Sequence, residues 1–141
     1  EREQRGEVAM GKIVATFAEP LHHICLTYGL KQSFDAMPHL NRREIRLRGK
    51  STYIENIVAP PPLMSRSGWN TRCRNIVSVS YWRESLAIAY NDEACTKEEV
   101  YTFVIALIKA YMSYRHPYTK MRIEGNKVIS EREGEIIATI D

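Results

Sequence analysis

The segment that begins with "TKEE", residues 96–99, constrains the fold most, because a helix start signal precedes a long helical pattern. Thr96 and Glu99 have the spacing of a capping box, in which each side chain hydrogen-bonds to the backbone of the other residue. Apolar residues then recur at helical spacing on several sides of the segment. The pattern predicts a helix over residues 97–115 that is buried on more than one side.

Two alternating segments, residues 75–82 and 85–90, precede this helix and are natural antiparallel neighbours. The Arg83-Glu84 pair between them is a poor two-residue turn, which leaves a bulge or one long bent strand open. In the first segment the alternation predicts one face that carries Ile76, Ser78, Ser80 and Trp82. The other predicted strands are residues 11–17, residues 41–50 and three short C-terminal segments that turn at Gly125-Asn126 and Gly134.

A second helical stripe follows Pro20, which suits the first position of a helix. Gly29 either ends this helix or weakens it, and a shorter amphipathic piece continues to Met37. These elements predict an α+β fold, a mostly antiparallel sheet with two main helices packed on it. The length of 141 residues predicts a single domain over 1–141. We expect residues 1–8 to be flexible, and residues 59–70 to form a flexible loop rich in Pro, Ser and Gly.

The chain has three cysteines, Cys25, Cys73 and Cys95. An odd number at wide spacing is no disulfide framework, so the sequence favours a reducing compartment, cytoplasmic or nuclear. The longest apolar run lies near residues 100–112 and is interrupted by Lys109, which makes it too short to span a bilayer.

The positive charge is concentrated in one quarter of the chain. Eight basic residues oppose only Glu44 and Glu55 between residues 42 and 74, a local net charge of +6, while the whole chain carries +3. In "NRREIRLRGK", residues 41–50, Ile45 and Leu47 are predicted to point inward and Arg46 and Arg48 outward.

This basic segment indicates a surface for a polyanion, either a nucleic acid or an anionic membrane. Exposed aromatic side chains would add platforms for bases. The predicted polyanion-binding residues are Arg42, Arg43, Arg46, Arg48, Lys50, Arg66, Arg72, Arg74 and Trp69. Two alternatives remain open: the arginines solvate an edge strand and discourage aggregation, or they bind an acidic protein partner.

Candidate catalytic and metal-binding residues are few. His22 and Cys25 share a helix face, but zinc requires three or four ligands and no CxxC or HxxxH pair is present. Cys73, between Arg72 and Arg74, is the one thiol with an evident reason for a lowered pKa. We therefore predict no catalytic residues, no metal, no cofactor and no small-molecule substrate.

The order of elements is similar to the core of rhabdovirus-type matrix proteins, over most of the chain. The residues that carry the likeness are "GKIVATF", "EPLHHICLTYGL", the loop "APPPL", the pair "NIVSVSYW" and "SLAIAYNDEA", a helix and a closing hairpin. The chain lacks the PPxY signal of some members and a lysine-rich amino-terminal arm. The resemblance implies a non-enzymatic, self-assembling structural protein that bridges a nucleocapsid and an anionic membrane.

Three functions therefore remain. The first is a non-enzymatic binding and self-assembly module with a basic face, which we expect to be a homo-oligomer. The second is a dedicated nucleic-acid-binding, RNA-binding domain that uses the same arginines and Trp69. The third is a small enzyme with a cleft around Cys73 or around His22 and His23.

Overall fold

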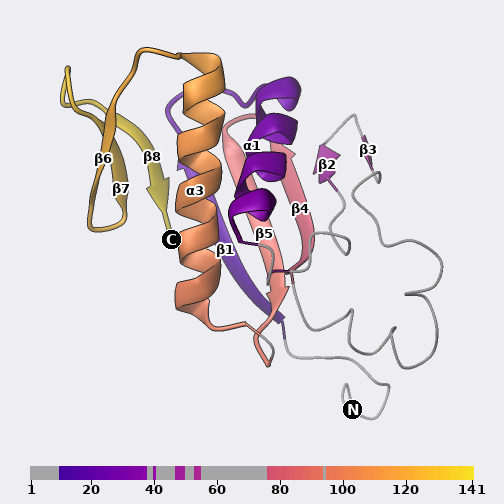
Figure 1. Ribbon diagram of the computed structural model, residues 1–141. Helices are drawn as coiled ribbons and strands as arrows, with labels where there is room; N and C mark the ends of the chain where they lie inside the picture. Colours follow the sequence, from indigo (N-terminus) through magenta and orange to yellow (C-terminus); the bar gives the residue numbers. More distant parts are fainter. Residues whose placement is uncertain (1–9, 38–39, 41–46, 50–52, 55–75, 94) are drawn as a thin grey trace, which may run out of the picture.

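The computed structural model describes residues 10–37, 40, 47–49, 53–54, 76–93 and 95–141. Two helices lie on one face of an eight-stranded sheet (Figure 1), the α+β fold that the sequence predicts. The elements in chain order are β1 (Met10–Phe17), α1 (His23–Ala36), β2 (Leu47–Gly49), β3 (Tyr53–Ile54), β4 (Ile76–Trp82), β5 (Ser85–Asn91), α3 (Lys97–Arg115), β6 (Met121–Glu124), β7 (Lys127–Ser130) and β8 (Ile136–Ile140).

The strand order across the sheet is β3-β2-β4-β5-β1-β8-β7-β6. The six strands β4-β5-β1-β8-β7-β6 of this order pair antiparallel with their neighbours. Strand β2 pairs with β4 in parallel. The first strand of the chain therefore lies in the middle of the sheet, between β5 and β8. It joins the β4–β5 hairpin to the C-terminal strands.

The predicted capping box starts α3. The N–H of Glu99 donates to Thr96 Oγ1 at 3.1 Å, and the N–H of Thr96 donates to Glu99 Oε1 at 2.9 Å. The helix then runs over Lys97–Arg115, as predicted, and is buried against both α1 and the sheet. The rings of Phe34 and Phe103 pack with centroids 4.6 Å apart between the two helices.

Helix α1 is continuous through Gly29 and begins at His23, three residues after Pro20. Gly29 lies directly against α3: a Cβ atom at this position would be 2.9 Å from the carbonyl oxygen of Leu107. The glycine therefore neither ends the helix nor merely weakens it. Its missing side chain allows the close contact with α3.

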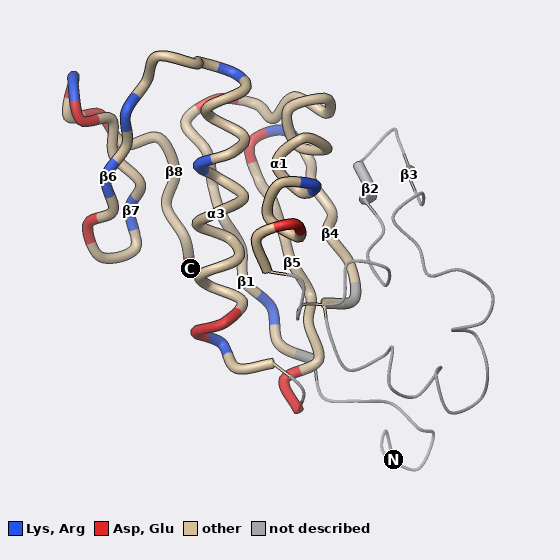
Figure 2. The backbone as a smooth tube through the Cα atoms, viewed as in Figure 1, with Lys and Arg blue, Asp and Glu red and all other residues tan. Residues whose placement is uncertain are grey.

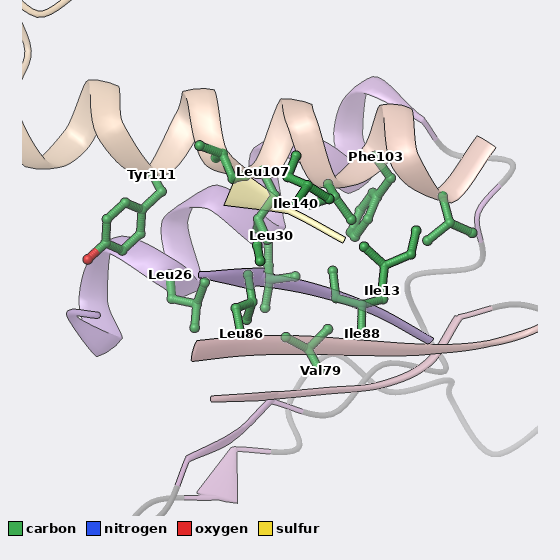
Figure 3. Packing of buried hydrophobic residues seen from close by; sticks show 14 of the residues in the cluster. Ile13, Leu26, Leu30, Val79, Leu86, Ile88, Phe103, Leu107, Tyr111 and Ile140 are labelled. Carbon is green, nitrogen blue, oxygen red and sulfur yellow. The ribbon is translucent and has the colours of Figure 1, made fainter. Parts of the chain in front are cut away.

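The core fills the space between the helix pair and the inner face of the sheet (Figure 3). Leu26 and Leu30 of α1 and Leu107 of α3 are fully buried. Strands β1 and β5 contribute every second residue to the core, as the pleat requires. The buried strand residues shown in Figure 3 include Ile13, Val79, Leu86, Ile88 and Ile140.

The other face of the sheet, which we call the outer face, is not covered by a helix in the described part of the chain (Figure 1). The register pairs Val14 with Ala87, and Ala87 with Ser80, so its centre consists of small, uncharged, half-buried residues. We define the outer face by Lys12, Val14, Thr16, Ser78, Ser80, Trp82, Ser85, Ala87, Ala89, Lys127 and Thr139.

Strand β4 departs from the predicted alternation. A register shift between Ile76 and Ser78 places Ile76, which is fully buried, opposite Tyr90 on the inner face. Ser78, Ser80 and Trp82 stay together on the outer face, as predicted. The bulge thus keeps the apolar side chain of Ile76 buried at the start of the strand.

Within the described ranges, neither helix combines the length and the apolar character needed to span a membrane. Residues 1–8 and 59–70, the two segments predicted to be flexible, lie outside the described residues.

Candidate functional site

Most of the predicted polyanion-binding residues lie outside the described part of the chain. They are Arg42, Arg43, Arg46, Lys50, Arg66, Trp69, Arg72 and Arg74. Arg48 is in β2, where the parallel ladder pairs it with Ser80 of β4 and the antiparallel ladder pairs it with Tyr53 of β3. The ladders thus join the basic segment to the edge of β4, at a row of the sheet that continues into Ala87 and Val14.

The second predicted location, the cleft around His22 and His23, lies at the start of α1. His23 Nδ1 is 2.6 Å from the hydroxyl oxygen of Tyr81, so the imidazole is held against β4. The backbone N–H of His22 donates to the hydroxyl of Tyr111 at 2.8 Å. Both contacts attach the helix start to neighbouring elements and bring no nucleophile to the histidines.

Cys25 lines the same groove as these histidines, and it is buried. Burial raises the pKa of its thiol, although the positive charge of Arg115 acts in the opposite direction. A raised pKa keeps the thiol protonated at neutral pH, which disfavours nucleophilic chemistry. Cys73 lies outside the described residues, and the described ranges contain no group of three potential metal ligands.

A different site emerges where α3 ends. A hollow of about 300 Å³ lies between the end of β1, the last turn of α3 and the β7–β8 turn. Its charged side chains are Glu19, Arg115, Glu133 and Glu135, and its apolar walls include Phe17, Met112, Ile136 and Ile137. We call this site the Arg115 hollow.

Arg115 has few polar contacts for a side chain that is only one-third exposed. Among the described residues its guanidinium has one ion pair, with 3.7 Å between Nη2 and Glu19 Oε1. Its Nε is buried and has no hydrogen-bond partner in the described part of the chain. The Glu19 side chain is 62% exposed, so this partner is held loosely. The guanidinium therefore keeps hydrogen-bonding capacity for another acceptor.

The floor of this region is aromatic. The rings of Phe17 and Tyr111 meet edge to face with centroids 5.2 Å apart. Burial raises the pKa of the Tyr111 hydroxyl, which keeps it neutral. A neutral hydroxyl that already accepts the His22 N–H serves as a structural link and adds no charge to the hollow.

Sequence reasoning missed the Arg115 hollow. Arg115 occupies the last turn of α3, where a basic residue simply suits the helix dipole. Glu133 and Glu135 lie in a turn, where acidic residues are ordinary. Only the pairing of β8 with β1 brings this turn beside the end of β1, and no local pattern in the sequence indicates that pairing.

Comparisons with known proteins identify no relative: no protein-family model matches the chain, and neither a curated protein nor a solved structure does.

Proposed function

We propose that this chain is a non-enzymatic binding and self-assembly module, similar to a viral matrix protein, with a basic face for polyanions. The observation that carries the proposal is the parallel pairing of β2 with β4. It joins a strand from the segment with a local charge of +6 directly to the sheet. Positive charge fixed to a rigid sheet binds phosphates better than the same charge on a free tail, because less entropy is lost on binding.

The described charges on the outer face support the same proposal. Lys12 and Lys127 lie on this face, with uncharged residues between them. The nearby Glu124 is neutralised by Arg122, with Nε and Oε2 2.6 Å apart. In Figure 2 strand β5 carries no charged residue along its length. An anionic surface therefore meets little repulsion over the centre of the sheet.

Exposed apolar residues support self-assembly. Ile24 of α1 is 67% exposed and Tyr114 of α3 is 49% exposed. Both line one shallow groove at the same end of the helix pair, and the Tyr114 ring packs on Tyr28 with centroids 4.8 Å apart. Neighbouring exposed apolar side chains are typical of protein–protein contacts. This is support for a homo-oligomer.

A dedicated RNA-binding domain is the second candidate, and Trp82 favours it. This residue ends β4 on the outer face and is 46% exposed, with the guanidinium carbon of Arg83 5.0 Å from its ring centroid. An exposed indole beside an arginine can stack on an unpaired base. Arg48, Lys12 and Trp82 would then belong to one sheet platform for single-stranded RNA.

We also infer a reducing compartment, cytoplasmic or nuclear. Cys25 and Cys95 are buried and carry thiols rather than a disulfide. Buried thiols without a bridge suit a compartment that keeps cysteines reduced.

The experiment that tests the proposal compares two polyanions under the same conditions. Binding of the protein to unstructured RNA and to vesicles with an anionic lipid is measured over a series of salt concentrations. Salt-dependent binding to the vesicles, with concentration-dependent assembly in solution, is expected of the matrix-like module. Binding to RNA alone would instead favour the dedicated RNA-binding domain. Failure to bind either polyanion contradicts both.

A further inference from the structure

We propose that the Arg115 hollow binds a small molecule of the α-amino-acid type, with its carboxylate on Arg115 and its ammonium group on Glu133. The proposal is separate from the polyanion face, because the described residues that line this hollow include none of the predicted polyanion-binding residues. It also departs from the expectation that the chain has no small-molecule ligand.

The Arg115 guanidinium is the anchor for the carboxylate. Its ion pair with Glu19, at 3.7 Å, is longer than a hydrogen bond. The Nε atom is buried, and none of the described residues accepts a hydrogen bond from it. A ligand carboxylate can accept two parallel N–H bonds from the accessible end of the guanidinium, an arrangement stronger than the ion pair with Glu19. The exposed Glu19 side chain is free to swing toward solvent as the ligand enters.

Glu133 is the partner for an ammonium group. Its carboxylate accepts a hydrogen bond from the hydroxyl of Ser130 at 3.2 Å, and its own N–H donates to that hydroxyl at 3.4 Å. Ser130 is buried, with 4% of its surface exposed, so it gives this carboxylate a fixed support. A supported carboxylate that lines the same hollow as an arginine can recognise a molecule that carries both charges.

The charges of the hollow select against other ligands. Three carboxylates, those of Glu19, Glu133 and Glu135, would repel a phosphate or any multiply charged anion. Arg115 would repel a simple cation. A zwitterion can place its negative group on the guanidinium and its positive group on a carboxylate, so each charge of the ligand meets an opposite charge.

The size and the apolar walls fit an aliphatic amino acid. A volume of about 300 Å³ lies at the lower end of small-molecule sites. Phe17 and Met112 are buried in the wall, and Ile136 is 45% exposed at the rim. An aliphatic side chain placed against Ile136 would cover apolar surface that now contacts water.

Three probes separate the two charges. L-leucine has both, N-acetyl-L-leucine keeps the carboxylate alone, and L-leucinamide keeps the ammonium group alone. Each is titrated into isotope-labelled protein while the amide resonances of Thr119, Ser130 and Ile137 are followed by NMR. We expect L-leucine to shift these resonances and each analogue to bind at least about tenfold more weakly, since each analogue lacks one charge-assisted hydrogen bond.

Two variants test the residues. Arg115→Gln should weaken L-leucine binding at least about tenfold, and Glu133→Gln should remove the preference for L-leucine over N-acetyl-L-leucine. Arg122→Gln is the matched control, because Arg122 lies outside the hollow on β6, and it should bind as the wild type does. Native amide spectra confirm that each variant is folded. If Arg115→Gln does not fold, binding of the three probes to the wild type and to Glu133→Gln still tests the proposal.

Several results would overturn the proposal. They are no shift with L-leucine at about 10 mM, equal binding of L-leucine and either analogue, or wild-type affinity in a folded Arg115→Gln protein. An unchanged preference in Glu133→Gln would equally remove the assigned ammonium partner. Binding of RNA and of anionic vesicles by the same variants is expected to be unchanged, so failure here and failure of the proposed function are distinguishable.

Discussion

The backbone N–H of His22 donates a hydrogen bond to the hydroxyl of Tyr111 at 2.8 Å, which ties the start of α1 to the end of α3. This bond compensates for the absence of a side-chain cap at the start of α1. The two residues are 89 positions apart in the sequence. The bond therefore depends on the packing of the helix pair and reports on it.

Tyr111→Phe removes this acceptor and keeps the ring. We expect it to lower the free energy of unfolding by about 1 kcal/mol, because the partly buried N–H of His22 loses its partner. Urea denaturation measures the change. Tyr118→Phe is the control, since Tyr118 is 97% exposed and should show no effect. Equal stability of the Tyr111→Phe protein and the wild type would show that water replaces the bond at no cost.

Phe103→Ala tests the packing of α3. Phe103 is fully buried and its ring lies against Phe34, so the cavity left behind should cost about 3–5 kcal/mol. Thermal and urea denaturation both measure this loss. Lys109→Ala, at an exposed position of the same helix, should leave stability unchanged. A small effect at Phe103 would contradict the buried position of its side chain.

Gly29→Ala distinguishes local propensity from tertiary contact by the sign of its effect. Helix propensity alone predicts that alanine stabilises α1 by about 1 kcal/mol. The added Cβ would instead lie 2.9 Å from the Leu107 carbonyl oxygen, and we expect a loss of about 1–3 kcal/mol. Gln32→Ala, at an exposed position of α1, serves as the control. An increase in the denaturation midpoint of Gly29→Ala would mean that the helices are farther apart.

Stability should fall at alkaline pH. Burial raises the pKa of the Cys25 and Cys95 thiols above the ordinary value of 9.0, and that of Tyr81, Tyr90 and Tyr111 above 10.0. The folded state thus favours the neutral form of each group. Its contribution is complete below the unfolded pKa and is lost as the pH rises through the folded pKa. Urea midpoints measured from pH 7 to 11 test this.

The thiols and the tyrosines can be separated within that series. Replacing both Cys25 and Cys95 with Ala should flatten the decline that begins near the thiol value of 9.0 and leave the later decline due to the tyrosines. A midpoint that stays constant up to pH 11 would be inconsistent with buried, neutral groups at these five positions.

The double variant Arg46→Ser with Arg48→Ser tests the basic face. We expect stability to change by no more than about 0.5 kcal/mol for each substitution, because the alternation in the sequence predicts that both side chains point outward. Polyanion binding should weaken, and the slope of its salt dependence should fall by about one for each phosphate that the variant no longer binds. A matched double variant of Lys31→Ser with Lys109→Ser, at two exposed positions on the helices, controls for net charge. Wild-type binding by Arg46→Ser with Arg48→Ser would mean that the arginines only solvate a strand.

The β4–β5 turn shows where local reasoning reaches its limit. Arg83 adopts a left-handed conformation, with φ at 58°, in a two-residue turn that its sequence does not favour. Neighbouring segments use both turn carbonyls: Leu21 N–H donates to Arg83 and Phe17 N–H donates to Glu84. These bonds from the β1–α1 connection, together with the β4–β5 ladder, offset the strain of the turn. The turn is thus selected by hydrogen bonds from a segment that is distant in the sequence.

The sequence by itself determined the elements whose signals are local: the capping box and helix 97–115, the strand segments, and their α+β combination. Each of these depends on residues within a few positions of one another, so a window of sequence contains the relevant forces. Only the tertiary structure decided that β1 lies between β5 and β8, that Gly29 admits a close helix contact, and that Arg115, Glu19 and Glu133 line one hollow. These features arise from packing between distant segments, whose free energy depends on shape and burial that no local pattern encodes.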